Sequence, residues 1–212
     1  MEKSTAEITL DYIKEHPHIK SCLKKGLINY SALSRSISKE LKIEKQTSKE
    51  AILVAARRIE EKLKDESKEE MRIKELFARS DVSIRNRIIV LVVEKDINLE
   101  ALDNIQKSIR KDHGIFYLIE GSASYTIITQ DNCKDVLLKK FDCKLIQSKN
   151  NRVMIDFKSP QSIEETRGVL SYITSLFSEN GVNIEEFMSC YTDTILIIKE
   201  GDLEKVVKIM KF

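Results

Sequence analysis

One short segment, Ser162 to Val169, places polar, charged and glycine residues just ahead of an apolar helical pattern. Backbone N–H groups at a helix start are unpaired and lie at the positive end of the helix dipole, so a carboxylate can bind there. Gly168 lets a ligand approach the backbone, Glu164 or Glu165 can meet an ammonium group, and Asn183 can offer its amide from a neighbouring strand. The candidate ligand-binding residues are Ser162, Ile163, Glu164, Glu165, Thr166, Arg167, Gly168, Val169, Asn183 and Ile184. The alternative is that Gly168 only lets the helix pack close to a sheet.

Residues for catalysis or metal binding are sparse. The histidines flank a proline or stand at a predicted helix end: His16, His18 and His113. No Ser or Cys has a neighbouring base in the sequence, and a Gly-rich phosphate loop is missing. The cysteines form no CxxC pair, which suits packing in a reducing compartment: Cys22, Cys133, Cys143 and Cys190. We therefore predict no catalytic residue, no metal site and no cofactor.

Basic residues gather in the amino-terminal part. Residues 1–64 hold 14 Lys and Arg against 9 Asp and Glu, a formal charge of +5, whereas the remainder carries −3. Such an excess permits contact with nucleic acid, which needs several cations on one face. The candidate nucleic-acid-binding residues are Arg35, Lys39, Lys49, Arg57 and Arg58. Ordinary solvated helix surface is the alternative, because acidic residues lie among them.

The same amino-terminal part reads as a bundle of four helices. We expect Thr5 to cap the first helix and His16-Pro17 to end it, since the residue before proline disfavours the α conformation. A short second helix ends at Gly26, and Ser48 caps the fourth. After the bundle, charges of alternating sign predict a solvated helical linker. The expected divisions are a helical domain at 1–64, the linker at 65–79, and two further modules at 80–148 and 149–212.

The two further modules repeat the order strand, helix, strand, strand, helix. The apolar run Ile88 to Val93 and the alternating segment Arg152 to Lys158 predict the first strand of each. Each following helix ends at a glycine, Gly114 or Gly181, where a left-handed residue is expected. Later strands of the two copies match at a constant offset of 70 residues. The pattern predicts an α+β fold with an internal repeat.

The first repeat differs at the position that matters for binding. Ala101 lies 13 residues before Gly114, as Gly168 does before Gly181, so the helices align without gaps. Alanine thus stands where the second copy has glycine. Asp96 and Asn98 nearby favour a capping role over ligand binding. A ligand is expected in the second module, or at a site completed by a partner chain.

The second repeat resembles an ACT domain. The segments Glu165 to Leu170, Asn180 to Ile184 and Asp193 to Ile198 match its glycine turn, its second strand and its third strand, although Arg167 replaces the usual proline. The tandem arrangement is most similar to the regulatory region of aspartokinases, without the kinase domain. This resemblance implies ferredoxin-like βαββαβ modules, amino-acid effectors at module interfaces, and interleaving, in which Asp81 to Arg85 completes the second module.

The amino-terminal bundle resembles, more loosely, helix-turn-helix regions attached to ACT proteins. Together these features predict a non-catalytic amino-acid-sensing regulator, with an effector-responsive DNA-binding protein as one form. The alternative is a free-standing allosteric subunit or scaffold that acts on a biosynthetic enzyme such as an aspartokinase. We expect a homodimer joined through sheet edges. The sequence shows no secretory signal and no stretch of about 20 apolar residues, so we expect a cytoplasmic protein without membrane contact.

Overall fold

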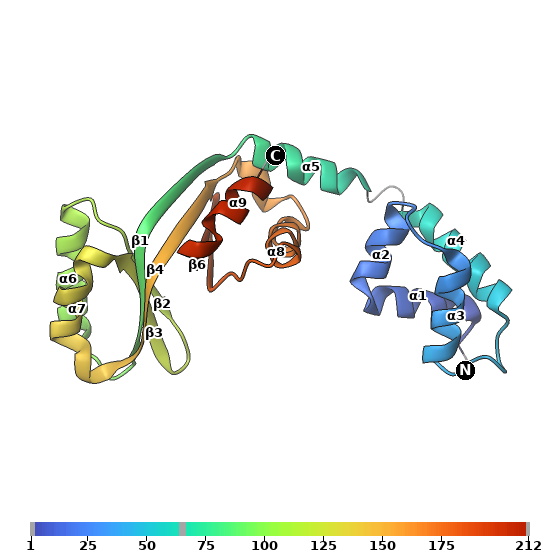
Figure 1. Ribbon diagram of the computed structural model, residues 1–212, viewed down its shortest axis with the longest axis horizontal. Coiled ribbons are helices and arrows are strands. Elements are labelled where there is room, and N and C mark those ends of the chain that lie inside the picture. The colour runs from blue at the N-terminus through green and yellow to red at the C-terminus, as the bar shows by residue number, and fades with distance from the viewer. Residues whose placement is uncertain (1–2, 64–66, 211–212) are drawn as a thin grey trace. The chain divides into compact units, whose positions relative to one another are not determined.

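The computed structural model describes residues 3–63 and 67–210, which fall into two compact units, residues 1–72 and 73–212. Figure 1 shows a helical unit and a unit built on one sheet. Within the described residues, no helix has the length and apolar character needed to cross a membrane. No three His, Cys, Asp or Glu side chains of these residues gather as a metal site requires.

The first unit contains four helices, α1 (Thr5–Glu15), α2 (Pro17–Lys24), α3 (Tyr30–Glu40) and α4 (Lys49–Leu63). Ser4, not Thr5, caps α1: its hydroxyl accepts from the Glu7 N–H, and the Glu7 carboxylate accepts from the Ser4 N–H. Asn29 caps α3 through the Ala32 N–H. Apolar residues from the four helices share one buried core, which includes Ile13, Leu23, Leu33, Ile37 and Ile52.

Helix α5 (Ser67–Ala78) differs from the solvated linker that the charges predicted. Ile73, Leu76 and Phe77 are buried in the core of the second unit. Their spacing of three and four residues puts them on one helical face. The charged run that precedes them hid this stripe. The carboxy-terminal half of α5 is therefore part of the sheet-based unit.

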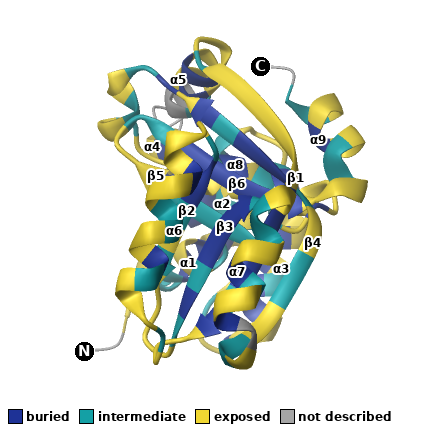
Figure 2. Cartoon of the chain, turned by 90° about the vertical axis from the view of Figure 1, so that its left-hand side faces the viewer, coloured by how far each residue is buried: buried dark blue, intermediate teal, exposed yellow. Residues whose placement is uncertain are grey.

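The second unit is built on a six-stranded antiparallel sheet in the order β2-β3-β1-β4-β6-β5. Figure 2 shows the buried residues concentrated in its central strands. Short 3₁₀ turns, η2 (Asp131–Cys133), η3 (Asp142–Lys144) and η5 (Glu200–Asp202), connect some of the elements. The strands are β1 (Asp81–Glu94), β2 (Phe116–Glu120), β3 (Ser124–Gln130), β4 (Leu145–Lys158), β5 (Glu186–Cys190) and β6 (Asp193–Lys199). The helices are α6 (Leu99–Lys111), α7 (Lys134–Phe141), α8 (Val169–Glu179) and α9 (Leu203–Ile209).

Strands β1 and β4 are long enough to serve both modules. The carboxy-terminal part of β1 pairs with β3, and the carboxy-terminal part of β4 pairs with β6. The amino-terminal residues Asp81–Arg85 of β1 pair with 154–158 of β4 in the second module. This is the pairing that the interleaving hypothesis required. The boundary expected between residues 148 and 149 lies inside β4, because one strand continues through both modules.

Two bulges face each other where the modules meet. On one side of the pair Ile88–Arg152, β1 has two residues opposite one of β4; on the other side, β4 has two residues opposite one of β1. Arg87 and Asn151, within these bulges, adopt positive φ values of 54° and 57°. Bulges bend strands and increase their twist. The long strands therefore change direction at this point.

The two halves of the sheet cover each other on the side without helices. The buried cluster there, called the seam cluster below, consists of Ile88, Val90, Ile115, Ile128, Met154, Ile195 and Ile197. On their other face β1 and β4 carry the residues packed under the helices, such as Leu91 in the first module and Ile155 in the second. Alternation along a strand places these two sets on opposite faces. Each module thus has its own helix-covered core, and the seam cluster joins them.

The ends of α6 and α8 correct the alignment drawn from the sequence. The left-handed residue after α6 is His113, at φ 56°, whereas Gly181 takes that position after α8. At the helix starts, Asn98 caps α6 and Gly168 occupies the same position before α8. The counterpart of Gly168 is therefore Asn98, at the 70-residue offset of the strands, and the pairing with Ala101 was wrong. The gapless alignment failed because α6 is two residues longer than α8.

Candidate functional site

The start of α8 is preceded by a folded loop. After β4 the chain makes a short 3₁₀ turn, η4 (Gln161–Glu164), and the Thr166 hydroxyl donates a hydrogen bond to the Ser162 carbonyl at 2.7 Å. Gly168 then adopts φ 84° at the N-cap position. A Cβ atom there would meet only Ile73 Cδ1 at 3.6 Å, an ordinary contact. The backbone conformation, not close packing, is therefore the structural reason for glycine.

The helix starts of the two modules differ in what occupies their N–H groups. At α6, Asn98 Oδ1 accepts a hydrogen bond from the Ala101 N–H at 3.0 Å. At α8, Gly168 has no side chain and no side-chain cap forms. The first-turn N–H groups of α8 remain available to an external acceptor, and the helix dipole favours an anionic one. The second module therefore has the open position that the first lacks.

A pocket of about 500 Å³ opens beside this helix start. Five of the expected ligand-binding residues line this pocket: Ile163, Glu164, Thr166, Gly168 and Val169. Leu170 and Ser171 of α8 add to the wall. The opposite wall comes from β5, the β5–β6 turn and β6, as Ser189, Tyr191 and Thr194. Sequence reasoning missed this wall, although Cys190 to Asp193 has the length of a two-residue hairpin turn.

Thr194 brings an unused polar group to the pocket. The residue is 0% exposed, and its hydroxyl has no hydrogen-bond partner among the described residues. Leu196 and Ile198, two and four residues later on β6, belong to the core under α8, so Thr194 faces the same side. An unpaired buried hydroxyl costs about 1–3 kcal/mol. A ligand atom in the pocket would remove that cost.

The remaining expected ligand-binding residues lie outside the pocket wall. Ser162, Glu165 and Arg167 are exposed on the same loop. Asn183 is also exposed and precedes β5, which begins at Glu186, so it is not on a strand as expected. Ile184 packs against the core of the second module. The neighbouring wall of the site is therefore formed further along the chain than the sequence suggested.

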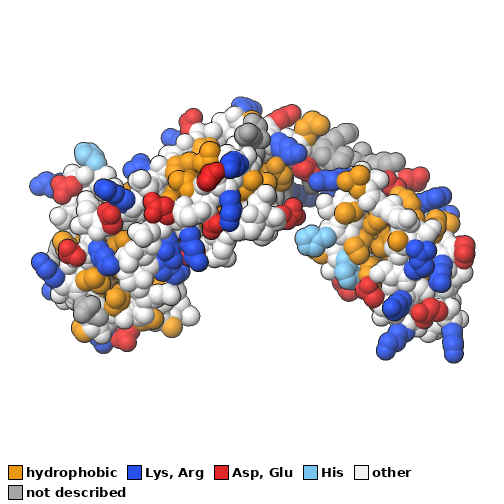
Figure 3. Space-filling model, viewed as in Figure 1, with side chains coloured by type: hydrophobic (Ala, Val, Ile, Leu, Met, Phe, Trp, Pro, Cys, Tyr) orange, Lys and Arg blue, Asp and Glu red, His pale blue; other side chains and the backbone are white. Residues whose placement is uncertain are grey.

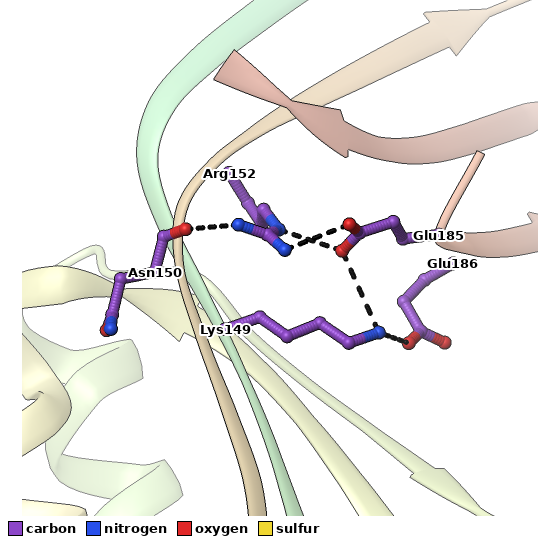
Figure 4. A network of polar contacts seen from close by, with 5 residues as sticks. All are labelled: Lys149, Asn150, Arg152, Glu185 and Glu186. Atoms are coloured by element: carbon purple, nitrogen blue, oxygen red, sulfur yellow. Dashed lines mark hydrogen bonds and ion pairs between the residues drawn. The ribbon is translucent and has the colours of Figure 1, made fainter. Parts of the chain in front are cut away.

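A polar network fixes the connection before β5 to the bulge in β4 (Figure 4). The Arg152 guanidinium donates to both Glu185 carboxylate oxygens, at 2.8 and 2.9 Å, and to the Asn150 carbonyl. Lys149 Nζ lies 3.5 Å from Glu186 and 3.7 Å from Glu185. Burial alone would raise the pKa of Glu185, but the Arg152 hydrogen bonds and the nearby positive charges hold it below its ordinary value. The network holds the start of β5 against β4 in the second module.

The basic residues of the helical unit have differing environments. Arg35, Lys39 and Lys49 are exposed on α3 and α4. The Arg57 guanidinium lies over the Tyr30 ring, 5.3 Å from its centroid, and the Tyr30 hydroxyl donates to Glu60. Arg58 lines an apolar groove of about 630 Å³ between α1 and α4. On the face shown in Figure 3, positive and negative side chains of this unit are interspersed.

Comparisons with known proteins find a family match within the sheet-based unit. Residues 147–211 match the ACT domain family. The aspartate kinase of Clostridium acetobutylicum, described as an allosteric enzyme, is similar in structure over 61% of this chain and 33% of its own, with 17% identity and a TM-score of 0.50. The ligand-free regulatory subunit of aspartate kinase from Thermus thermophilus matches over 61% of this chain and 92% of its own, with 10% identity and a TM-score of 0.46.

These comparisons concern parts of proteins. The chain spans about one third of the length of the Clostridium enzyme. At 17% identity the likeness shows a shared fold. A comparison with curated proteins gave no match. Residues 147–211 therefore form an ACT domain, and the chain shares a fold with part of an aspartate kinase.

Proposed function

We propose that this protein is a non-catalytic regulator that senses an amino acid through its second module. The observation that carries the proposal is the pocket beside α8, where an uncapped helix start and the unpaired Thr194 hydroxyl meet. The match of residues 147–211 to ACT domains supports the same assignment.

The lining chemistry suits an α-amino acid. The ligand carboxylate accepts hydrogen bonds from the first-turn N–H groups of α8, where the dipole favours a negative charge. The ammonium group faces the Glu164 carboxylate, and Thr194 supplies a hydroxyl for either group. Tyr191, 63% exposed in the left-handed hairpin turn, can close over the ligand side chain.

A thermal-shift titration with the twenty amino acids tests this function. Binding to the native state raises stability by mass action, so at least one amino acid should raise the melting temperature. Thr194→Val keeps the side-chain shape and removes the unpaired hydroxyl. We expect it to leave the ligand-free melting temperature unchanged or higher and to abolish most of the ligand-induced rise.

Thr129→Val is the matched control. Thr129 is also buried, but its hydroxyl donates to the Ile115 carbonyl at 2.7 Å. The change should destabilise the protein by about 1–3 kcal/mol, because that carbonyl is left unpaired, and it should preserve the ligand-induced shift. No shift with any amino acid at millimolar concentration would refute the proposal, as would a shift that stays undiminished in Thr194→Val for every amino acid that stabilises the unmodified chain.

We propose further that the protein acts as a homodimer and that the helical unit transmits the ligand state to a partner. Strands β2 and β5 form the edges of the sheet, and unpaired edge strands favour pairing with another chain. Light scattering after size exclusion measures the dimer directly. A regulatory effect requires the ligand to prefer one arrangement of the dimer over another.

DNA and protein partners can be separated experimentally. If the partner is DNA, genomic fragments should be retarded on gels, with an affinity that falls steeply as salt rises. Reversing the charges of Lys49, Arg57 and Arg58 should then abolish retardation. Absence of salt-sensitive retardation assigns the helical unit to protein contact, as in a free-standing regulator of an amino-acid biosynthetic enzyme.

A further inference from the structure

A second pocket, of about 300 Å³, lies where the two modules meet, away from the α8 loop. Its wall includes Tyr117 of β2 and Met154 of β4, which belong to or pack against the seam cluster. Asp156 and Arg85 complete that side. Arg85 pairs with Met154 across β1 and β4, and Asp156 follows Met154 by two residues, so all three side chains face the helix-free side.

The first module supplies the other side of the pocket through the turn after α6. The His113 N–H donates to the Arg110 carbonyl, and the Gly114 N–H donates to the Ile109 carbonyl at 2.8 Å. A Cβ atom on Gly114 would lie 2.7 Å from Ile109 Cγ2 and 2.9 Å from the Ile109 carbonyl oxygen. Only glycine fits this close turn. The turn therefore holds Arg110 and His113 at the mouth of the pocket.

The charged groups of the pocket have unused capacity. Within the described part of the chain, the guanidinium group of neither Arg85 nor Arg110 forms an ion pair within 4.0 Å or a hydrogen bond. Asp156 Oδ1 is buried and also lacks a hydrogen-bond partner there. A buried carboxylate oxygen without a donor is costly. Burial, reinforced by the nearby charge of Asp193, raises the pKa of Asp156 above its ordinary value of 3.8, and the positive charges of Arg85 and Lys158 offset only part of this effect.

We propose that this pocket is a second ligand site and that it takes an acidic amino acid. Two guanidinium groups and one carboxylate line it, and the complementary ligand carries two anionic groups and one cationic group. An α-amino acid with a carboxylate side chain has this charge pattern at neutral pH. Its carboxylates bind Arg85 and Arg110, and its ammonium group donates to Asp156 Oδ1.

The position of the pocket gives the ligand a structural effect. Arg110 and Tyr117 belong to the first module, whereas Asp156 lies in the half of β4 that pairs with β6 in the second. The bound molecule bridges groups from both modules and stabilises the packing of their helix-free faces. The site shares no lining residue with the pocket beside α8. The two pockets can therefore hold different ligands.

Isothermal titration of the full chain with L-glutamate, L-aspartate and glutarate tests this assignment. Glutarate has the two carboxylates of glutamate but no ammonium group. We expect Asp156→Asn to weaken binding of the better amino acid by about tenfold or more and to leave glutarate binding within about twofold, because only the ammonium contact is lost. Arg110→Gln should weaken all three ligands by about tenfold or more.

Arg79→Gln is the matched control, since Arg79 is exposed and lines neither pocket. It should bind like the unmodified chain, and Thr194→Val should retain glutamate or aspartate binding even if the pocket beside α8 has lost its ligand. Absence of binding by both acidic amino acids at millimolar concentration would overturn the proposal. So would equal losses for glutamate and glutarate in Asp156→Asn, or tighter binding of inorganic phosphate than of either amino acid.

Discussion

At the scale of single residues, the conformation of Gly168 links stability to binding. Its φ of 84° is unfavourable for any residue with a Cβ atom. Gly168→Ala should reduce the free energy of unfolding by about 1–2 kcal/mol and weaken ligand binding at the α8 pocket, because the helix start shifts to relieve the strain. Chemical denaturation and the amino-acid thermal shift measure the two effects.

Gly201→Ala provides the comparison for Gly168→Ala. Gly201 has open space around its Cβ position and no positive φ, so alanine should change stability by less than about 0.5 kcal/mol. Equal effects of the two changes would show that the left-handed conformation at Gly168 is unimportant.

The Arg152–Glu185 ion pair should make the stability of the protein depend on pH. The Glu185 side chain is 7% exposed, and its pKa is lowered from the ordinary 4.5 in the folded protein. A carboxyl with a lowered folded pKa contributes stability above its unfolded pKa, and this is lost as the pH falls through the folded value. The stability difference between the unmodified chain and Glu185→Gln should therefore shrink as the pH falls below about 4.5.

Denaturation by urea at a series of pH values measures the difference in unfolding free energy between the unmodified chain and Glu185→Gln. The titration of the other carboxyl groups contributes equally to both proteins and cancels in this difference. Arg152→Met at neutral pH should cost about 3 kcal/mol or more, since it leaves the Glu185 carboxylate buried beside a weaker partner, Lys149. A stability difference that stayed constant from pH 7 to pH 3 would contradict the proposed pairing.

At the scale of elements, the carboxy-terminal half of α5, from Ile73 onward, belongs to the sheet-based unit. The Phe77 ring contacts Phe157 edge-on, with centroids 5.4 Å apart, and stacks near Tyr172. Phe77→Ala should destabilise this unit by about 3–5 kcal/mol through the cavity it leaves. Met71→Ala on the same helix, at a side chain 65% exposed, should have almost no effect. Chemical denaturation followed by circular dichroism distinguishes these outcomes.

The elements also show what sequence reasoning can and cannot reach. Periodicity identified the helices, and the apolar runs identified the Ile88–Val93 part of β1 and the Arg152–Lys158 part of β4, because those signals are local. Capping was less exact, since Ser4 and not the expected Thr5 caps α1. The pocket wall from Ser189 to Thr194 was missed, since it depends on which strands become neighbours. The sequence identified Asn98 as a helix cap but did not reveal that Asn98 and Gly168 occupy equivalent positions. The start of α6 uses a capping side chain, whereas the start of α8 uses a left-handed backbone conformation. Burial of Ile73, Leu76 and Phe77 was hidden by charged neighbours.

At the scale of the whole molecule, the shared strands make the two modules a single cooperative unit. Both β1 and β4 run through both modules, so unfolding one module leaves half of each strand without a partner. Leu102→Ala in the first module and Ile173→Ala in the second remove buried side chains from separate cores. Each should cost about 2–5 kcal/mol and lower the same calorimetric transition.

The helical unit is compact by itself and has its own core, so it should melt separately. Ile37→Ala, in the centre of that core, should lower a different transition and leave the one shared by the modules in place. Differential scanning calorimetry of the full chain resolves the two. If Leu102→Ala and Ile173→Ala instead lowered two distinct transitions, the continuity of β1 and β4 would not couple the modules, and a ligand at their junction could not act on both.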